Sequence, residues 1–388
     1  MDVQARENAP GYAASGMAAA RRPFERSVPP AVLVLVAPIA IALIAGLWSG
    51  LARIGVEVPA LVRFLTVNHG ALMVSGVVGT VIGLERSVAM GRPAAYAGPL
   101  LSAAGALALV AAPSWDGAPV LFVASAVAVV LLFLAFLRRQ FATPLAVMTV
   151  GVACWGVGNV TWMVEGWAPR LILPWWIAFL ALTIAGERLE LTRFLPLRWP
   201  ARATLWGAAG VLLVGPLVAF ASEEAGLRLA GAGVLALGLW LVKNDTARRT
   251  YRRGGLASYA GVALLAAYGW LSVSGLALLA WALEPGLHYD TTLHTFFLGF
   301  VFGAIFAHAP IILPAITGLT VRYTLLFPAG LALLHGSLAL RVAANLAEQP
   351  TLRELGGSLN VISVLVLAAA IVAGLVLGRR REGSPAAA

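Results

Sequence analysis

The chain has 388 residues, of which 60% are hydrophobic and only 11% charged. A soluble domain carries about a quarter charged residues, so this chain lacks the polar surface that a water-soluble fold needs. In a soluble protein, the formal net charge of +10 would suggest nucleic acid as a partner. We expect no nucleic acid here, because Lys and Arg gather in the cytoplasmic loops of membrane proteins.

Apolar runs that are long enough to cross a bilayer recur along the whole chain. A transmembrane helix needs about 20 such residues, and the unbroken runs lack the short alternating strands of a membrane β-barrel. We therefore predict an all-α fold, a polytopic transmembrane helical bundle of about twelve spans. The predicted spans are 30–50, 66–84, 94–112, 119–137, 144–164, 171–186, 204–221, 226–242, 258–283, 290–316, 323–340 and 358–378.

No soluble domain interrupts these runs. The sequence predicts one twelve-span membrane domain, 29–378, between a flexible N-terminal tail, 1–28, and a C-terminal tail, 379–388. The first apolar run is long enough to span and lacks a clear cleavage site after it. We expect a retained helix there and not a signal peptide.

The distribution of Lys and Arg gives the expected orientation, since these residues mark the cytoplasmic side of a membrane protein. It predicts that both termini are cytoplasmic and that the protein is a multi-pass component of the cell inner (cytoplasmic) membrane, with the lipid bilayer as its first partner. With the N-terminus inside, all 27 Lys and Arg fall in inner segments except Arg53, Arg63, Arg170, Arg228, Arg341 and Arg353.

Four of the 5 histidines lie in predicted spans, where ionisable residues are costly and usually mark a functional site. His69, His294 and His335 each lie close to the outer end of a different span, about 5–8 Å below the outer edge at about 1.5 Å per residue. This matched depth predicts that the three imidazoles share one metal site. His308 lies roughly 21 Å deeper than His294 on a straight helix, so it would belong to a second site or a relay.

Neutral imidazole binds haem iron, copper and zinc, so haem b and copper are the cofactors we expect. Arg63 and Arg341 lie at the level where haem propionates would need cations. Asp290, one turn before His294, is placed to orient the imidazole of that residue. Glycines follow His69 and His294 in their spans, and small residues there let a planar ring or another helix approach closely.

Two segments resemble known families. Segment 66–73 (TVNHGALM) resembles the second helix of the haem–copper oxidase catalytic subunit, where a His-Gly pair followed by Met carries a low-spin haem ligand. Segment 290–294 (DTTLH) is similar to the start of the tenth helix of that family, which supplies haem ligands. Segment 293–310 is also similar to the NnrS group, twelve-span haem- and copper-containing proteins linked to nitric oxide stress.

The resemblance implies that His69 and His294 are axial haem ligands, with His308 as the alternative ligand from the tenth span. His335 would then complete a copper site or face a haem from a third side. The chain departs from the oxidases because it has no adjacent His-His pair. Its predicted sixth and seventh spans, 171–186 and 204–221, hold no histidine. We therefore do not expect oxygen reduction at a binuclear centre.

The leading functional hypothesis is a haem- and/or copper-binding membrane protein of respiratory or nitrogen-oxide redox chemistry, or of nitric oxide stress. Its partners would be an electron-transfer protein or other membrane subunits. One alternative is a proton-coupled secondary transporter, in which the helix unwinds near Pro310 and Pro314 while His308 and Glu187 carry protons. Another is a structural subunit of a membrane redox complex that uses its histidines only for packing.

Overall fold

The structure, a computed structural model, describes residues 29–59, 65–113, 115–191 and 198–382. Within these ranges there is no β-strand, and twelve helices are long and apolar enough to span a membrane. This confirms the predicted polytopic helical bundle. The predicted N-terminal tail, 1–28, lies outside the described residues. Of the predicted C-terminal tail, 379–388, the first four residues continue the last helix to Glu382, and 383–388 lie outside the described residues.

Most spans are single helices, and the second, third, eighth and tenth are built from shorter consecutive elements. The elements are α2 (Pro30–Arg53), η1 (Thr66–Asn68), α4 (His69–Ala71), η2 (Leu72–Gly79), α5 (Thr80–Met90), η3 (Pro93–Tyr96), α6 (Ala97–Ala111), α7 (Ala118–Arg139), α8 (Thr143–Glu165), α9 (Pro169–Leu191), α10 (Trp199–Ala219), α11 (Glu223–Asn244), α12 (Ala247–Thr250), α13 (Gly255–Trp281), α14 (Leu287–His294), η4 (Thr295–Phe302), α15 (Gly303–Thr317), α16 (Leu326–Leu346) and α17 (Pro350–Glu382).

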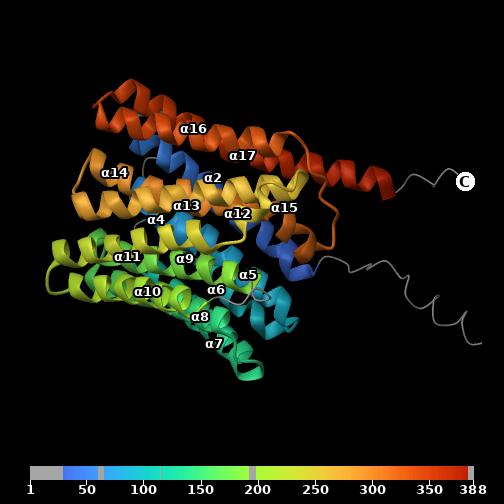
Figure 1. Cartoon of the computed structure of the whole chain (residues 1–388), viewed down its shortest axis with the longest axis horizontal. Helices are drawn as coiled ribbons and strands as arrows, with labels where there is room; N and C mark the ends of the chain where they lie inside the picture. Colours follow the sequence, from blue (N-terminus) through green and yellow to red (C-terminus); the bar gives the residue numbers. More distant parts are fainter. Residues whose placement is uncertain (1–28, 60–64, 114, 192–197, 383–388) are drawn as a thin grey trace, which may run out of the picture.

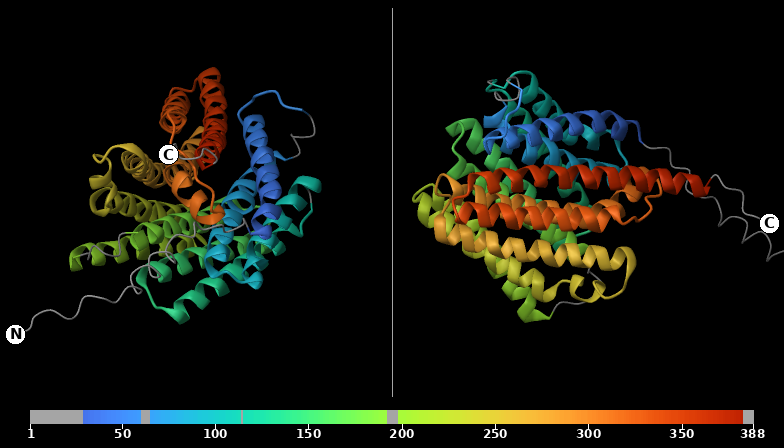
Figure 2. Two further views of the ribbon diagram at one scale, coloured as in Figure 1. Left: turned by 90° about the vertical axis from the view of Figure 1, so that its right-hand side faces the viewer. Right: turned by 90° about the horizontal axis from the view of Figure 1, so that it is seen from above.

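The helices run along one common direction, and many neighbours in sequence are also neighbours in space (Figure 1). The most extensive contacts join α8 to α9, α10 to α11, α11 to α13 and α16 to α17. The start of α2 and the end of α17 lie at the same end of the bundle (Figures 1 and 2). An even number of spans requires this arrangement. That this end faces the cytoplasm remains a prediction from the charge distribution.

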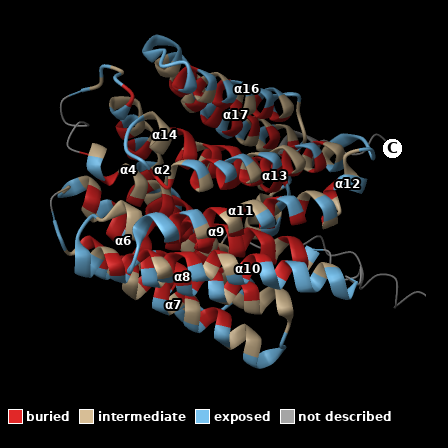
Figure 3. Ribbon diagram, turned by 60° about the vertical axis from the view of Figure 1, so that its left-hand side comes forward, coloured by how far each residue is buried: buried red, intermediate tan, exposed pale blue. Residues whose placement is uncertain are grey.

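Helix α9 forms the centre of the bundle. In its most apolar stretch 83% of residues are buried inside the protein, against 28% for the first span, α2. Figure 3 shows the contrast, with buried residues concentrated around α9 and exposed ones on the outer helices. The exposed faces of the outer helices are rich in Leu and Val, which suits contact with lipid tails.

Two spans contain a wider, π-helical segment of eight residues, η2 in the second span and η4 in the tenth. Such segments are rare and often occur at functional sites. The altered backbone frees carbonyl groups, and in a membrane these need partners inside the protein. Ser102 donates from its hydroxyl to the Ser75 carbonyl in η2. Thr295 donates to the carbonyls of Thr291 and Thr292, just before η4.

Helix α15 continues through Pro310 and Pro314. The unwound segment that the transporter hypothesis expects there is not found in this part of the chain. The helix ends at Thr317, and Gly318 follows in the left-handed conformation, with φ 71°, which a glycine adopts without steric cost.

Glycines allow α10 and α11 to approach until their backbones touch. A side chain at Gly233 of α11 would collide with the backbone of Leu212 in α10, and one at Gly226 would collide with Ala219. By contrast, Gly210 on α10 faces open space. Close packing of small residues is a principal source of helix association in lipid.

We expect Gly233→Val to lower the thermal unfolding temperature of the detergent-purified protein, because the added methyl groups overpack the α10–α11 contact at a cost of about 1–3 kcal/mol. The matched control is Gly210→Val, which places the same side chain on the open face and should leave the unfolding temperature close to that of the wild type. Equal shifts for both variants would contradict the packing described here.

Candidate functional site

A cavity of about 410 Å³ lies between α2, the His69 end of the second span, α14–η4, α16 and α17. Its walls are mostly apolar, and three arginines border it. Small-molecule and cofactor sites have this character and about this size. The apolar residues of the wall include Leu47, Leu51, Met73, Val74, Trp167, Leu293, Phe297, Val301, Phe302 and Val361, and the arginines are Arg53, Arg341 and Arg353.

His69 is held by α2. Its Nδ1 lies 2.8 Å from the carbonyl oxygen of Gly46. A carbonyl oxygen only accepts hydrogen bonds, so Nδ1 carries the proton and Nε2 keeps its lone pair. Gly50, one turn further along α2, makes room for the ring, because a side chain there would come within 2.9 Å of Cε1 of His69. The sequence of α2 thus fixes both the position and the tautomer of this imidazole.

His294 is held within its own helix. Its Nδ1 lies 2.8 Å from the backbone oxygen of Asp290 and 3.1 Å from a carboxylate oxygen of the same residue. Both of these atoms accept hydrogen bonds, so the ring again donates through Nδ1 and leaves Nε2 as the electron-pair donor. A histidine that binds a metal commonly has this arrangement, with its second nitrogen bonded to a carbonyl or carboxylate.

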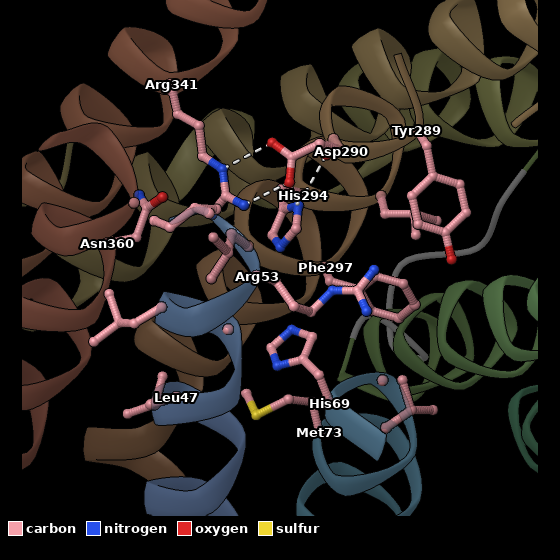
Figure 4. A pocket seen from close by; sticks show the side chains of 18 of the residues that line it. Leu47, Arg53, His69, Met73, Tyr289, Asp290, His294, Phe297, Arg341 and Asn360 are labelled. Atoms are coloured by element: carbon pink, nitrogen blue, oxygen red, sulfur yellow. Dashed lines mark hydrogen bonds and ion pairs between the residues drawn. The ribbon is translucent and has the colours of Figure 1, made fainter. Parts of the chain in front are cut away.

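The two imidazoles face each other across the cavity, with one ring nitrogen of each turned toward the other (Figure 4). Their centroids are 6.4 Å apart, and the ring planes differ by 30°. A metal bound to both Nε2 atoms at about 2.0–2.1 Å would place the centroids about 6 Å apart. The spacing therefore fits one metal ion between the rings, with little rearrangement.

Asp290 connects this pair of histidines to the eleventh span. Its carboxylate accepts both hydrogen bonds of a bidentate pair with Arg341, one of them from Nε at 2.9 Å. It also accepts a bond of 2.8 Å from the amide of Asn345. Asp290 and Arg341 are both buried. Breaking a buried pair by removing one partner leaves a buried charge uncompensated, so this contact constrains α14 and α16 strongly.

Two further arginines are available at the cavity. Arg53, at the end of α2, donates to the Thr66 carbonyl at 3.2 Å and lines the same cavity as the two histidines (Figure 4). Arg353 of α17 forms a long ion pair with Asp290, its Nε lying 3.9 Å from the carboxylate, and that nitrogen has no hydrogen-bond partner among the described residues. Arg63, which the sequence suggested for this role, lies outside the described residues.

Most of the glycines that the sequence pointed to serve helix packing. Side chains at Gly76 and Gly79 would meet Ala106 and Trp155, and one at Gly299 would meet Trp270. Only Gly70 of that set lines the cavity. The close approach that these glycines permit is therefore mainly between helices.

The structure does not bring His335 to this cavity, which corrects the expectation of three imidazoles in one site. The eleventh helix was predicted to end at residue 340, yet α16 continues to Leu346. His335 therefore lies eleven residues from the outer end, about 16 Å deep at about 1.5 Å per residue. It packs beside Gly303, nine positions after His294. Among the described residues, no group of three or more His, Cys, Asp or Glu side chains is placed to hold a metal.

His308 belongs to a separate buried network in the other half of the bundle. Its Nε2 lies 3.3 Å from a guanidinium nitrogen of Arg188 in α9. Arg188 in turn forms a bidentate pair with Asp245, at 2.9 and 3.0 Å. This pairing could not be predicted from the sequence, because the three residues come from spans far apart in the chain. His308 is thus too far along the helix to act with His294.

His288, the histidine outside the predicted spans, and Glu187 lie near the ends of the bundle. His288 is partly exposed and pairs with Glu284 at 3.2 Å. Glu187 pairs with Arg86 at 3.5 Å, and Arg86 also contacts Glu190 at 3.3 Å. This second cluster joins α5 to α9, at the end of the bundle opposite the histidine pair.

Comparison with known proteins places the chain in a family. The family model described as "Domain of unknown function (DUF8744)" matches residues 32–376. The chain belongs to this family. No curated protein and no solved structure is significantly similar to it.

We expect Asp290→Ala to destabilise the protein by about 3–5 kcal/mol, because Arg341 would remain buried without its partner. The double variant Asp290→Leu with Arg341→Met should recover much of the loss, because Arg341, the buried partner of this carboxylate, is then no longer a charge without a counterion. Thermal unfolding in detergent measures both. If the single and double variants lose the same stability, the pair does not hold α14 against α16.

Proposed function

We propose that this protein binds one b-type haem between His69 and His294 and serves as an electron-transfer component of the membrane. One observation carries the proposal. The two imidazoles present their free Nε2 atoms to each other across an apolar cavity, with centroids 6.4 Å apart. Each ring donates through Nδ1 to an oxygen atom, so both have the tautomer that axial ligation requires.

The donor set favours haem over a bare metal ion. Copper and zinc sites usually take three or four protein ligands, whereas the described residues place no third His, Cys, Asp or Glu ligand with the two imidazoles here. Haem iron needs no more than two, because the porphyrin supplies the remaining four nitrogens. Copper, the other cofactor that the sequence suggested, therefore has less support at this position.

The surrounding residues suit the periphery of a haem. Aromatic and aliphatic side chains, among them Phe297, Leu47 and Trp167, provide apolar walls. Arg53 and Arg353 provide positive charge at the cavity, where two propionates would need it. Arg341 is already paired with Asp290, so we assign it the task of holding Asp290, and through it His294, in place.

A haem supplies one-electron chemistry through the change between ferric and ferrous iron. His69 and His294 would hold the haem between them, and a haem held by two protein ligands would supply electron transfer and not the binding of a gaseous substrate. The protein residues keep both rings oriented and exclude water with their apolar side chains. The respiratory or nitrogen-oxide setting suggested by the sequence is consistent with such a role and is part of the proposal.

The purified protein is expected to show a Soret band that shifts on reduction, because bis-imidazole haem absorbs strongly there. His69→Ala and His294→Ala should each abolish or strongly reduce this band, measured as absorbance per mole of protein after purification with added haem. The matched control is His288→Ala, a partly exposed histidine of the same part of the chain that does not line the cavity, which should retain the wild-type spectrum. A protein that stays colourless after reconstitution and contains no iron would refute the proposal.

Gly50 offers a test that leaves both ligands intact. A larger side chain at Gly50 would collide with the His69 ring, so Gly50→Val should displace this imidazole and lower haem occupancy several-fold. Gly210→Val is the control, since Gly210 faces open space. Haem content is measured by the pyridine haemochrome assay on folded protein isolated by size exclusion. Full occupancy in Gly50→Val would show that His69 is not held as described.

A further inference from the structure

A second cavity, of about 450 Å³, lies between α13 and α16. Each helix contributes a stripe of residues at helical spacing, so that two faces are turned toward one groove. The stripe of α13 is Gly255, Ser258, Tyr259 and Val262, and that of α16 is Pro328, Leu331, Ala332 and His335, with Tyr323 at one end. None of these residues belongs to the cavity between His69 and His294.

His335 closes the deep end of this groove and has an unsatisfied donor. The indole N–H of Trp270 donates to its Nδ1 at 3.1 Å. Since Nδ1 accepts, the neutral ring carries its proton on Nε2. This Nε2 is buried and has no hydrogen-bond partner among the described residues. The tautomer thus makes His335 a hydrogen-bond donor and not a metal ligand, and a buried donor calls for an acceptor.

The acceptor has to reach the middle of the membrane. His335 lies nine residues from the start of α16 and eleven from its end, so about 14–16 Å from either side at 1.5 Å per residue. Phospholipid headgroups stay near the surfaces of a hydrocarbon core about 30 Å thick, and acyl chains offer no acceptor. A ligand that dissolves in the membrane and carries a carbonyl oxygen meets both requirements.

The other end of the groove favours a flat ring system. Tyr259, Tyr323 and Phe327 form an aromatic cluster with centroid separations of 5.6 to 5.9 Å. The hydroxyl of Tyr259 is already committed to the Phe306 carbonyl at 2.9 Å, which holds its ring in place. Aromatic surfaces of this kind pack well against planar ligands.

We propose that this groove binds the headgroup of a membrane quinone, with a quinone carbonyl accepting the hydrogen bond from Nε2 of His335. The binding itself does not depend on the proposed haem. The two cavities are nevertheless adjacent: Phe297 and Val301 of η4 line the first one, whereas Gly303, just after η4, faces His335. The two cavities are thus separated by one helix, a thickness of about 10 Å.

The test is a titration of the purified protein in detergent with a short-chain benzoquinone, following the quenching of tryptophan fluorescence. Quinones quench indole fluorescence at close range, and Trp270 touches His335. Saturable binding is expected for the wild type. His335→Leu, which removes the donor, should weaken binding at least tenfold, and Ala332→Phe, which fills the groove, should do the same. Ala339→Phe is the matched control, because Ala339 is exposed on the same helix and does not line the groove.

An azido-quinone photolabel gives a second readout that involves neither haem nor fluorescence. Labelled peptides from α13 and α16 that disappear in Ala332→Phe would support the site. The inference is overturned if the wild type shows no saturable binding, or if both groove variants bind as tightly as Ala339→Phe. It is also overturned if the groove proves to be covered by a second copy of this chain, seen as a dimer that Ala332→Phe dissociates. Loss of the Soret band in His69→Ala with quinone binding retained would separate the two sites.

Discussion

The carboxylate of Asp290 is the interaction on which the outer half of the bundle depends. Within a membrane every buried polar group needs a partner inside the protein, and this one carboxylate serves three, the guanidinium of Arg341, the amide of Asn345 and the ring of His294. It thereby joins α14 to α16 and orients an imidazole. The position of α14 in the cavity wall and the direction of the His294 ring both depend on these contacts of the Asp290 carboxylate.

The sequence predicted the architecture well, because a bilayer imposes one requirement that is easy to read. Every span must be apolar over about 20 residues, and all twelve predicted spans overlap a helix. Depth along a helix is also readable, since each residue adds about 1.5 Å. That is why the expectation that His69 and His294 meet agrees with their geometry. The same reasoning misplaced His335, because an error of six residues at the end of α16 moved it by about 9 Å.

Partners across the bundle could not be read in this way. Depth says how far a residue lies from the surface and nothing about which helices stand next to each other. The pairing of Arg188 with Asp245 joins α9 to the end of α11, and nothing in the sequence distinguishes either residue from the other charged residues near span ends. Arg53 was likewise counted only as an outer positive charge, although it borders the cavity. Gly46 contributes through its backbone carbonyl, which every residue type has.

The two π-helical segments have a consequence for how this protein can vary. A π-helical turn accommodates one more residue than an α-helical turn, so each segment amounts to a one-residue insertion that the fold has absorbed. Deleting one residue from η2 would turn everything on one side of it by about 100° relative to the other. His69 and the Arg86 cluster lie on opposite sides of η2. The η2 segment therefore determines how the His69 end of the span is rotated about the helix axis relative to the Arg86 end. An alignment of this family should show single-residue gaps there.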